Sequence, residues 1–292
     1  MLLGEYKNGN YLVSIWDDGT KMRATGKENF IPDFPECIDL KITNYCDMNC
    51  AYCHEDSSIA GRHADLSAEF IDTLHPYTEL AIGGGNPLSH PDLGQFLLDL
   101  KKKRIIANIT VNQTHFLQEY SRIQKLIELN LIKGIGISII NPTEELIEKI
   151  KAIPNAVCHV IAGIITKEQL DKLSNNDLKL LVLGYKELRR GYHYFSDSIA
   201  ERITEFAQVL PQYYSRFKLI SFDNLALMQL NTQDTISQEK WDSYYMGDDG
   251  QFTMYIDLVN QEYAKNSTSL DRFRLEKDII TMFKNIQSME EI

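Results

Sequence analysis

Strand-length apolar runs alternate with amphipathic stretches through most of this 292-residue chain. The apolar runs cover residues 37–43, 80–82, 105–111, 134–140, 156–162, 178–183 and 217–222. Stretches with helical periodicity lie between them, at residues 67–74, 93–103, 120–129, 144–151, 167–173 and 198–210. This alternation predicts a parallel sheet whose strands are joined by right-handed crossovers. With six or seven such units, we expect an α/β fold, a partial (β/α)6-type barrel of the TIM kind.

The two ends of the chain follow a different pattern. Residues 11–16 and 21–25 flank an Asp-Asp-Gly-Thr turn, which predicts a β-hairpin. Near the other end, residues 251–259 alternate like a strand, and a helix is expected from about residue 270 to the C-terminus. We therefore predict an N-terminal hairpin over residues 1–34, a core barrel over 35–225 and an α+β extension over 226–292.

Composition and charge exclude several classes of protein. With 43% hydrophobic and 24% charged residues, the chain has an ordinary globular composition. The net charge of −11 argues against long nucleic acid as a partner, because binding to phosphates requires a basic face. No run approaches the roughly 18 apolar residues of a membrane span. The N-terminal segment lacks the features of a signal peptide, so we expect a cytoplasmic protein.

Three of the five cysteines fall within eight residues, directly after the first barrel strand. Cys46, Cys50 and Cys53 form a C-x3-C-x2-C pattern, and thiolates favour zinc, copper(I) or iron–sulfur clusters. A structural zinc site needs four ligands, and His54 is awkwardly adjacent to Cys53. A four-iron cluster held by three cysteines leaves one iron open for another ligand. The odd number of cysteines argues against disulfides, and Cys37 and Cys158 are expected to be structural.

Two other interpretations of these cysteines are possible. The segment from Cys50 to His54 matches C-x-x-C-H, the attachment pattern of c-type haem. Cys50 and Cys53 also match a thioredoxin-like redox pair. Both interpretations leave Cys46 without a role.

The segment KITNYCDMNCAYCHE resembles the C-x3-C-x-aromatic-C signature of the radical S-adenosylmethionine (SAM) superfamily. The resemblance implies that Cys46, Cys50 and Cys53 bind a [4Fe-4S] cluster and that its fourth iron binds SAM. It also implies that Tyr52 packs near the adenine.

Motifs after the later strands extend the resemblance. Gly83-Gly-Gly-Asn-Pro is similar to the family's GGEP motif, with Asn86 in place of the usual glutamate. The asparagine keeps an acceptor oxygen but lacks the charge, so we expect a weaker contact to the methionine ammonium of SAM. The residues implied as SAM contacts are Tyr52, Gly84, Gly85, Asn86, Pro87, Asn112, Ser138, Ile161 and Gly163. No cysteine follows Cys158, so no auxiliary cluster is expected in the extension.

The resemblance implies an enzyme that cleaves SAM with one electron to methionine and a 5′-deoxyadenosyl radical, which takes hydrogen from a substrate. The electron would come from an external donor such as flavodoxin or ferredoxin. We expect a small-molecule or nucleotide substrate, with Lys186, Arg189, Arg190 and His193 near an anionic group. Alternatives are a peptide-modifying enzyme with a short-peptide substrate, or a non-catalytic iron–sulfur or zinc protein.

Overall fold

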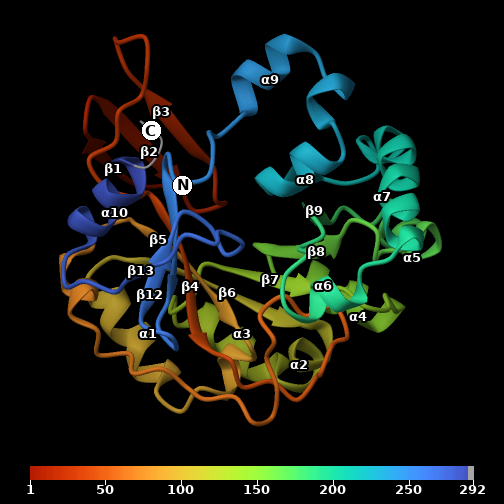
Figure 1. The fold of residues 1–292 in the computed structure, drawn as a ribbon, viewed down its shortest axis with the longest axis horizontal. Coiled ribbons are helices and arrows are strands. Elements are labelled where there is room, and N and C mark those ends of the chain that lie inside the picture. Colours follow the sequence, from red (N-terminus) through yellow and green to blue (C-terminus); the bar gives the residue numbers. More distant parts are fainter. Residues whose placement is uncertain (289–292) are drawn as a thin grey trace.

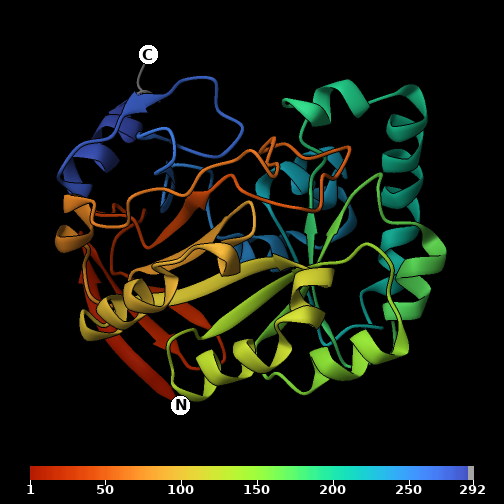
Figure 2. The ribbon, with the colours of Figure 1, turned by 90° about the horizontal axis from the view of Figure 1, so that it is seen from below.

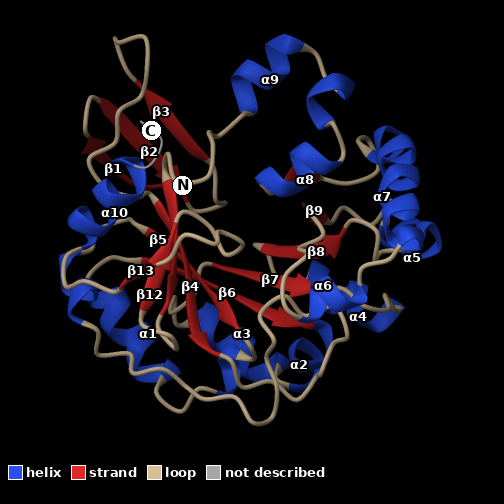
Figure 3. Ribbon diagram, in the orientation of Figure 1, coloured by secondary structure: helices blue, strands red, loops and turns tan. Residues whose placement is uncertain are grey.

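The structure is a computed structural model that describes residues 1–288. It contains two sheets, shown in Figure 3 with the helices that surround them. The smaller sheet is antiparallel and consists of β1 (Leu2–Asn8), β2 (Tyr11–Trp16) and β3 (Lys21–Ala24). The predicted hairpin is therefore present as β2 and β3, and a further strand precedes it.

The larger sheet has ten strands in the order β10-β9-β8-β7-β6-β5-β4-β11-β12-β13. Its strands are β4 (Cys37–Thr43), β5 (Glu79–Gly84), β6 (Ile106–Asn112), β7 (Gly134–Ser138), β8 (Ala156–Ile161), β9 (Lys179–Leu183), β10 (Leu219–Phe222), β11 (Thr253–Asp257), β12 (Glu262–Ala264) and β13 (Phe273–Arg274). Neighbours from β10 to β11 are parallel, and the last two pairings are antiparallel. The predicted α/β class with a parallel sheet is confirmed.

Helices cover the outer face of this sheet (Figure 2). The helices of residues 1–288 are α1 (Leu93–Lys102), α2 (Gln113–Gln118), α3 (Tyr120–Glu128), α4 (Glu144–Lys151), α5 (Lys167–Leu173), α6 (Arg190–Tyr194), α7 (Asp197–Val209), α8 (Asn224–Gln229), α9 (Gln238–Tyr244) and α10 (Ile279–Gln287). Of these, α9 projects beyond the barrel (Figure 1). The side of each strand that faces the helices is apolar and joins one core, represented by Leu40, Ile82, Ile109, Val160 and Val182. Among residues 1–288, no helix has the length and hydrophobicity to span a bilayer.

The sheet curls until its two ends approach each other. Lys186, which follows β9, donates from Nζ to Ser267 Oγ over 2.9 Å, although six strands separate β9 from β12 in the sheet. Asn224, which follows β10, donates to Asp249 Oδ1 over 2.9 Å, just before β11. Within the described part of the chain, β10 and β11 do not pair. The structure is thus an incomplete barrel, consistent with the prediction, and the second face of each strand lines its interior.

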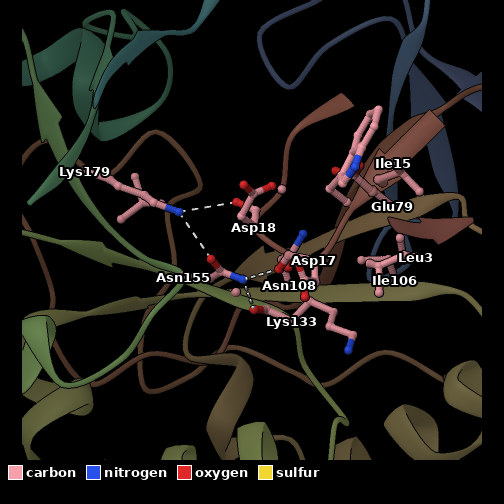
Figure 4. A pocket seen from close by; sticks show the side chains of 14 residues that line it. Leu3, Ile15, Asp17, Asp18, Glu79, Ile106, Asn108, Lys133, Asn155 and Lys179 are labelled. Atoms are coloured by element: carbon pink, nitrogen blue, oxygen red, sulfur yellow. Dashed lines mark hydrogen bonds between the residues drawn. The ribbon is translucent and has the colours of Figure 1, made fainter. Parts of the chain in front are cut away.

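The small N-terminal sheet closes the amino ends of the barrel strands. Figure 4 shows the contact, around a cavity of about 130 Å³. Asn155 Nδ2 donates to the carbonyls of Asp17 (2.7 Å) and Lys133 (3.2 Å). Lys179 Nζ donates to the Asp18 carbonyl and to Asn155 Oδ1. Because this end is covered, a reactive site has to form at the carboxyl ends of the strands.

Three predicted elements differ from the structure. Residues 67–74 form only a short 3₁₀ turn, Glu69–Thr73, and Leu74 after it is already extended. The expected C-terminal helix begins only at Ile279, because Phe273 and Arg274 pair with β12; its predicted continuation to residues 289–292 lies outside the described residues. The strand predicted at 251–259 is present as β11, Thr253–Asp257. It differs from the prediction in its place, because it pairs with β4 inside the barrel sheet.

Candidate active site

The three clustered cysteines lie on a long loop that leaves the carboxyl end of β4. Backbone hydrogen bonds fold this loop back on itself: Cys46 N donates to Ser58 O (2.9 Å), and Ser58 N donates to Asn44 O (3.1 Å). A tight turn in which Cys53 N donates to Cys50 O (3.2 Å) brings those two residues together. All three thiols are half-buried and free.

The donor set fits an iron–sulfur cluster with one open iron. Burial raises the pKa of the Cys46 and Cys50 thiols, and the neighbouring cysteines raise the pKa of both further. The two remaining cysteines lie elsewhere, Cys158 in the core of β8 and Cys37 at the start of β4. Soft thiolates in this number match a [4Fe-4S] cluster that keeps one iron for another ligand. A zinc site would need a fourth ligand.

A second ligand group shares one of these cysteines. Side-chain atoms of Cys46, Asp47 and His115 all lie within 4.8 Å of one another. His115 is buried at the start of α2, and its Nε2 is 2.6 Å from Asp47 Oδ1. This contact fixes the cysteine loop to the strand-end of β6, because α2 follows that strand directly.

A buried ionic network holds the far end of the cysteine loop. Lys41 Nζ lies 2.7 Å from Glu55 Oε2 and 3.1 Å from Asp257 Oδ2, and all three side chains are buried. The Tyr255 hydroxyl also donates to Glu55, over 3.2 Å. Burial alone would raise the pKa of the Glu55 carboxyl, but contacts to His54 and Lys41 outweigh burial and hold it well below its usual range. The loop is thereby joined to β4 and β11.

Two of the predicted substrate residues instead contact the cysteine loop. Arg189 donates to the His54 carbonyl (3.1 Å) and lies 3.3 Å from Glu55 Oε2. Arg190 donates to Asn49 Oδ1 (2.6 Å) and to the Ser57 carbonyl, and it pairs with Asp56. Both guanidinium groups are therefore engaged by protein groups.

The other two predicted substrate residues are separated. Lys186 bonds Ser267 at the barrel opening, whereas His193 is exposed on α6 beside the ring of Tyr192. Tyr52, the residue predicted to lie near the adenine, is on the cysteine loop. Its ring packs against that of Tyr194 on α6, with ring centroids 5.9 Å apart.

The glycine loop after β5 packs directly on the cysteine loop. Gly85 N donates to Thr43 O and Asn86 N donates to Tyr45 O, both over 2.7 Å. A Cβ atom at Gly85 would lie 2.1 Å from the Tyr45 carbonyl oxygen, so only glycine permits this approach. Asn86 Oδ1 accepts from Leu88 N, which caps the 3₁₀ turn Pro87–Ser89.

The remaining predicted SAM contacts lie at the carboxyl ends of successive strands. Asn112 ends β6 and caps α2, and Ser138 ends β7. Ile161 ends β8, and Gly163 follows with φ +79°, where a Cβ would lie 2.7 Å from Ile203 on α7. Together with the loops after β4 and β5, these residues share one edge of the sheet.

The sequence prediction missed two ionisable residues on the inner face of the barrel, Asp39 and His159. Asp39 on β4 is exposed to solvent, and the surrounding protein raises its pKa to about 6; nearby Lys186 opposes this shift, while Asp249, Asp223 and Glu55 add to it. Burial lowers the pKa of His159 on β8 to about 4. The sequence did contain a signal, because polar residues alternate with core residues in Cys-Ile-Asp-Leu-Lys-Ile-Thr and Val-Cys-His-Val-Ile.

Comparisons with known proteins agree with this site. The family model described as "Radical SAM superfamily" matches residues 40–164, which include the cysteine loop and the ends of β4 to β8. No curated protein matches the chain.

Solved structures of Streptococcus suis SuiB have a similar fold. SuiB bound to its precursor peptide SuiA has a TM-score of 0.60 and 16% identity, over 87% of this chain and 65% of SuiB. SuiB bound to S-adenosylmethionine has a TM-score of 0.60 and 16% sequence identity, over 87% of this chain and 66% of SuiB. The chain thus spans about two thirds of the length of SuiB.

The family implies a [4Fe-4S] cluster and SAM as cofactors. The family match covers the loop that carries the three free thiols at the open end of the barrel. Residues 40–164, which carry this loop, are thus similar to the radical SAM superfamily.

Proposed function

We propose that this protein is a radical SAM enzyme in which Cys46, Cys50 and Cys53 bind a [4Fe-4S] cluster. With SAM and one electron, these cofactors supply a 5′-deoxyadenosyl radical that abstracts hydrogen from a substrate. The observation that carries the proposal is the set of three half-buried free thiols on one braced loop at the open end of the barrel. A cytoplasmic location and an electron donor such as flavodoxin or ferredoxin are part of the proposal.

The chain's own residues would position SAM and keep the cluster loop rigid. Three sets of contacts hold the loop: Asp47 with His115, Glu55 with Lys41, and Arg189 and Arg190, at the start of α6, with Glu55 and Asp56. The glycine loop and the strand ends at Asn112, Ser138 and Ile161 would contact SAM, in line with the family motifs.

The cationic residues that follow β9 predict a small-molecule or nucleotide substrate, because they could bind an anionic group. Because Arg189 and Arg190 are engaged with the cysteine loop, their positions give no support to a phosphate site. Peptide modification is the second candidate, and two observations favour it: an open cleft at the seam where β10 and β11 do not pair, and the similarity of fold to SuiB, whose structure holds a precursor peptide.

The proposal is tested by anaerobic reconstitution with iron and sulfide, followed by SAM and dithionite and an assay for 5′-deoxyadenosine. We expect brown protein, with product that disappears in Cys50→Ala and persists in the control Cys37→Ala. If no product forms without substrate, the assay is repeated with candidate small molecules and peptides. Colourless protein with stoichiometric zinc would contradict the proposal.

A further inference from the structure

A cleft of about 720 Å³ lies between the α8–α9 segment and the loops that flank β11 and β12. One wall includes Leu225 and Met228 of α8 and Trp241 of α9; the other includes Asp249 and Asn266. In Figure 1, α9 projects beyond the barrel, so this wall stands apart from the main sheet. The cleft is an open groove and not an enclosed cavity.

The groove lies at the seam between the two ends of the barrel sheet. Asp249 lines it and accepts hydrogen bonds from Asn224 Nδ2 (2.9 Å) and Asn266 Nδ2 (2.7 Å), across the seam where β10 and β11 do not pair. Asp249 is also among the charges that act on Asp39 on the inner face of β4. The groove therefore runs along the open seam of the barrel.

The charged lining of the groove is predominantly acidic. Its ionisable residues with a formal charge are Asp234, Asp248, Asp249 and Lys265. Within residues 1–288, none of these four side chains forms an ion pair. An acidic lining of this kind is complementary to a positively charged ligand.

Apolar and aromatic side chains provide the remaining surface. Trp241 and Tyr245 stack with centroids 4.7 Å apart and an interplanar angle of 15°, and Met228 is 68% exposed. Aromatic faces attract cations as well as apolar side chains. A small molecule is usually enclosed over most of its surface, which an open groove does not provide, whereas an extended peptide can lie along a groove.

We propose that this groove binds a peptide segment carrying lysine or arginine and directs it to the barrel opening. The inference rests on the proposed function, for which it names the substrate class: a basic peptide. Asp234 and Asp248 would pair with its cations, and the Trp241–Tyr245 wall would contact its apolar parts.

The chain has two tryptophans, so Trp16→Phe leaves Trp241 as a single fluorescent reporter inside the groove. In cluster-loaded full-length protein, we expect acetyl-Gly-Lys-Gly-Lys-Gly-amide to change Trp241 emission saturably, and the glutamate counterpart to have no effect. The double variant Asp234→Asn/Asp248→Asn should weaken binding about three- to tenfold, the size expected for two partly exposed ion pairs. Added salt should weaken it as well.

Asp242→Asn is the matched control, because Asp242 is exposed on the same helix α9 but does not line the groove. No change is expected in this variant. Equal binding of the glutamate peptide, an unchanged affinity in the double variant, or equal binding of n-butylamine would overturn the proposal. The titration does not require SAM cleavage, so its failure is distinguishable from failure of the proposed enzymatic activity.

Discussion

At the scale of single residues, the site depends on which face of a strand each side chain occupies. Along β8, Cys158 and Val160 are buried in the outer core, while His159 faces inward beside Ser138 of β7. A Cβ atom at Gly136 would lie 2.2 Å from the His159 ring, so the glycine makes room for the imidazole. Within the described residues, the half-buried His159 ring has no hydrogen-bond partner, and desolvation by the surrounding protein lowers its pKa to about 4.

The lowered pKa of His159 predicts acid sensitivity. An unfolded histidine has a pKa near 6.5 and gains a proton as the pH falls, while the folded residue stays neutral until about pH 4. Stability is therefore lost as the pH falls from about 6.5 to 4. Between pH 7.5 and 5, wild type should lose about 1–2 kcal/mol more free energy of unfolding than His159→Gln, measured by urea denaturation. Equal losses in both proteins would show that the ring is solvated.

At the scale of elements, local sequence predicts strands better than it predicts short helices. All seven predicted barrel strands are present, because each is a compact apolar run between turns. The short helices α2, α6, α8 and α9 were not predicted, since each offers only one or two turns of periodicity. The glycine loop was predicted to approach SAM; its closest contact in the structure is the backbone of the cysteine loop.

This contact makes Gly85 sensitive to substitution. In Gly85→Ala, the new methyl group meets the Tyr45 carbonyl and separates the two loops. We expect a loss of about 1–3 kcal/mol in unfolding free energy, as for other forced overpacking. Iron bound per chain after reconstitution should fall at least twofold. Gly94→Ala is the control, because nothing lies within 4 Å of its Cβ and alanine favours the helix α1.

At the scale of the whole molecule, the two ends of the barrel have different roles. The N-terminal sheet packs on the amino ends of the strands through Asn155 and Lys179. The cysteine loop and the glycine loop lie at the carboxyl ends of the strands. This division is common in barrel enzymes, where conserved chemistry and structural closure occupy opposite ends.

Asn155→Leu should therefore destabilise the protein without changing its chemistry. The leucine cannot donate to the carbonyls of Asp17 and Lys133, which leaves partly buried acceptors unsatisfied. Calorimetry should show a loss of about 1–3 kcal/mol. Cluster content and SAM cleavage per folded chain should remain within twofold, and a larger decrease would indicate that the two ends are coupled.

The sequence by itself determined the alternating strands and helices and the three-cysteine loop, because these depend on short-range spacing. Only the tertiary structure decided the partners of Arg189 and Arg190, which lie more than 130 residues from the loop that they contact. It also placed β11 beside β4 and brought Asp39, Lys186 and Asp249 into one electrostatic neighbourhood. The alternation of residues along a strand determines on which face of the sheet a side chain lies. The curl of the sheet determines which side chains from distant parts of the sequence lie near it on that face.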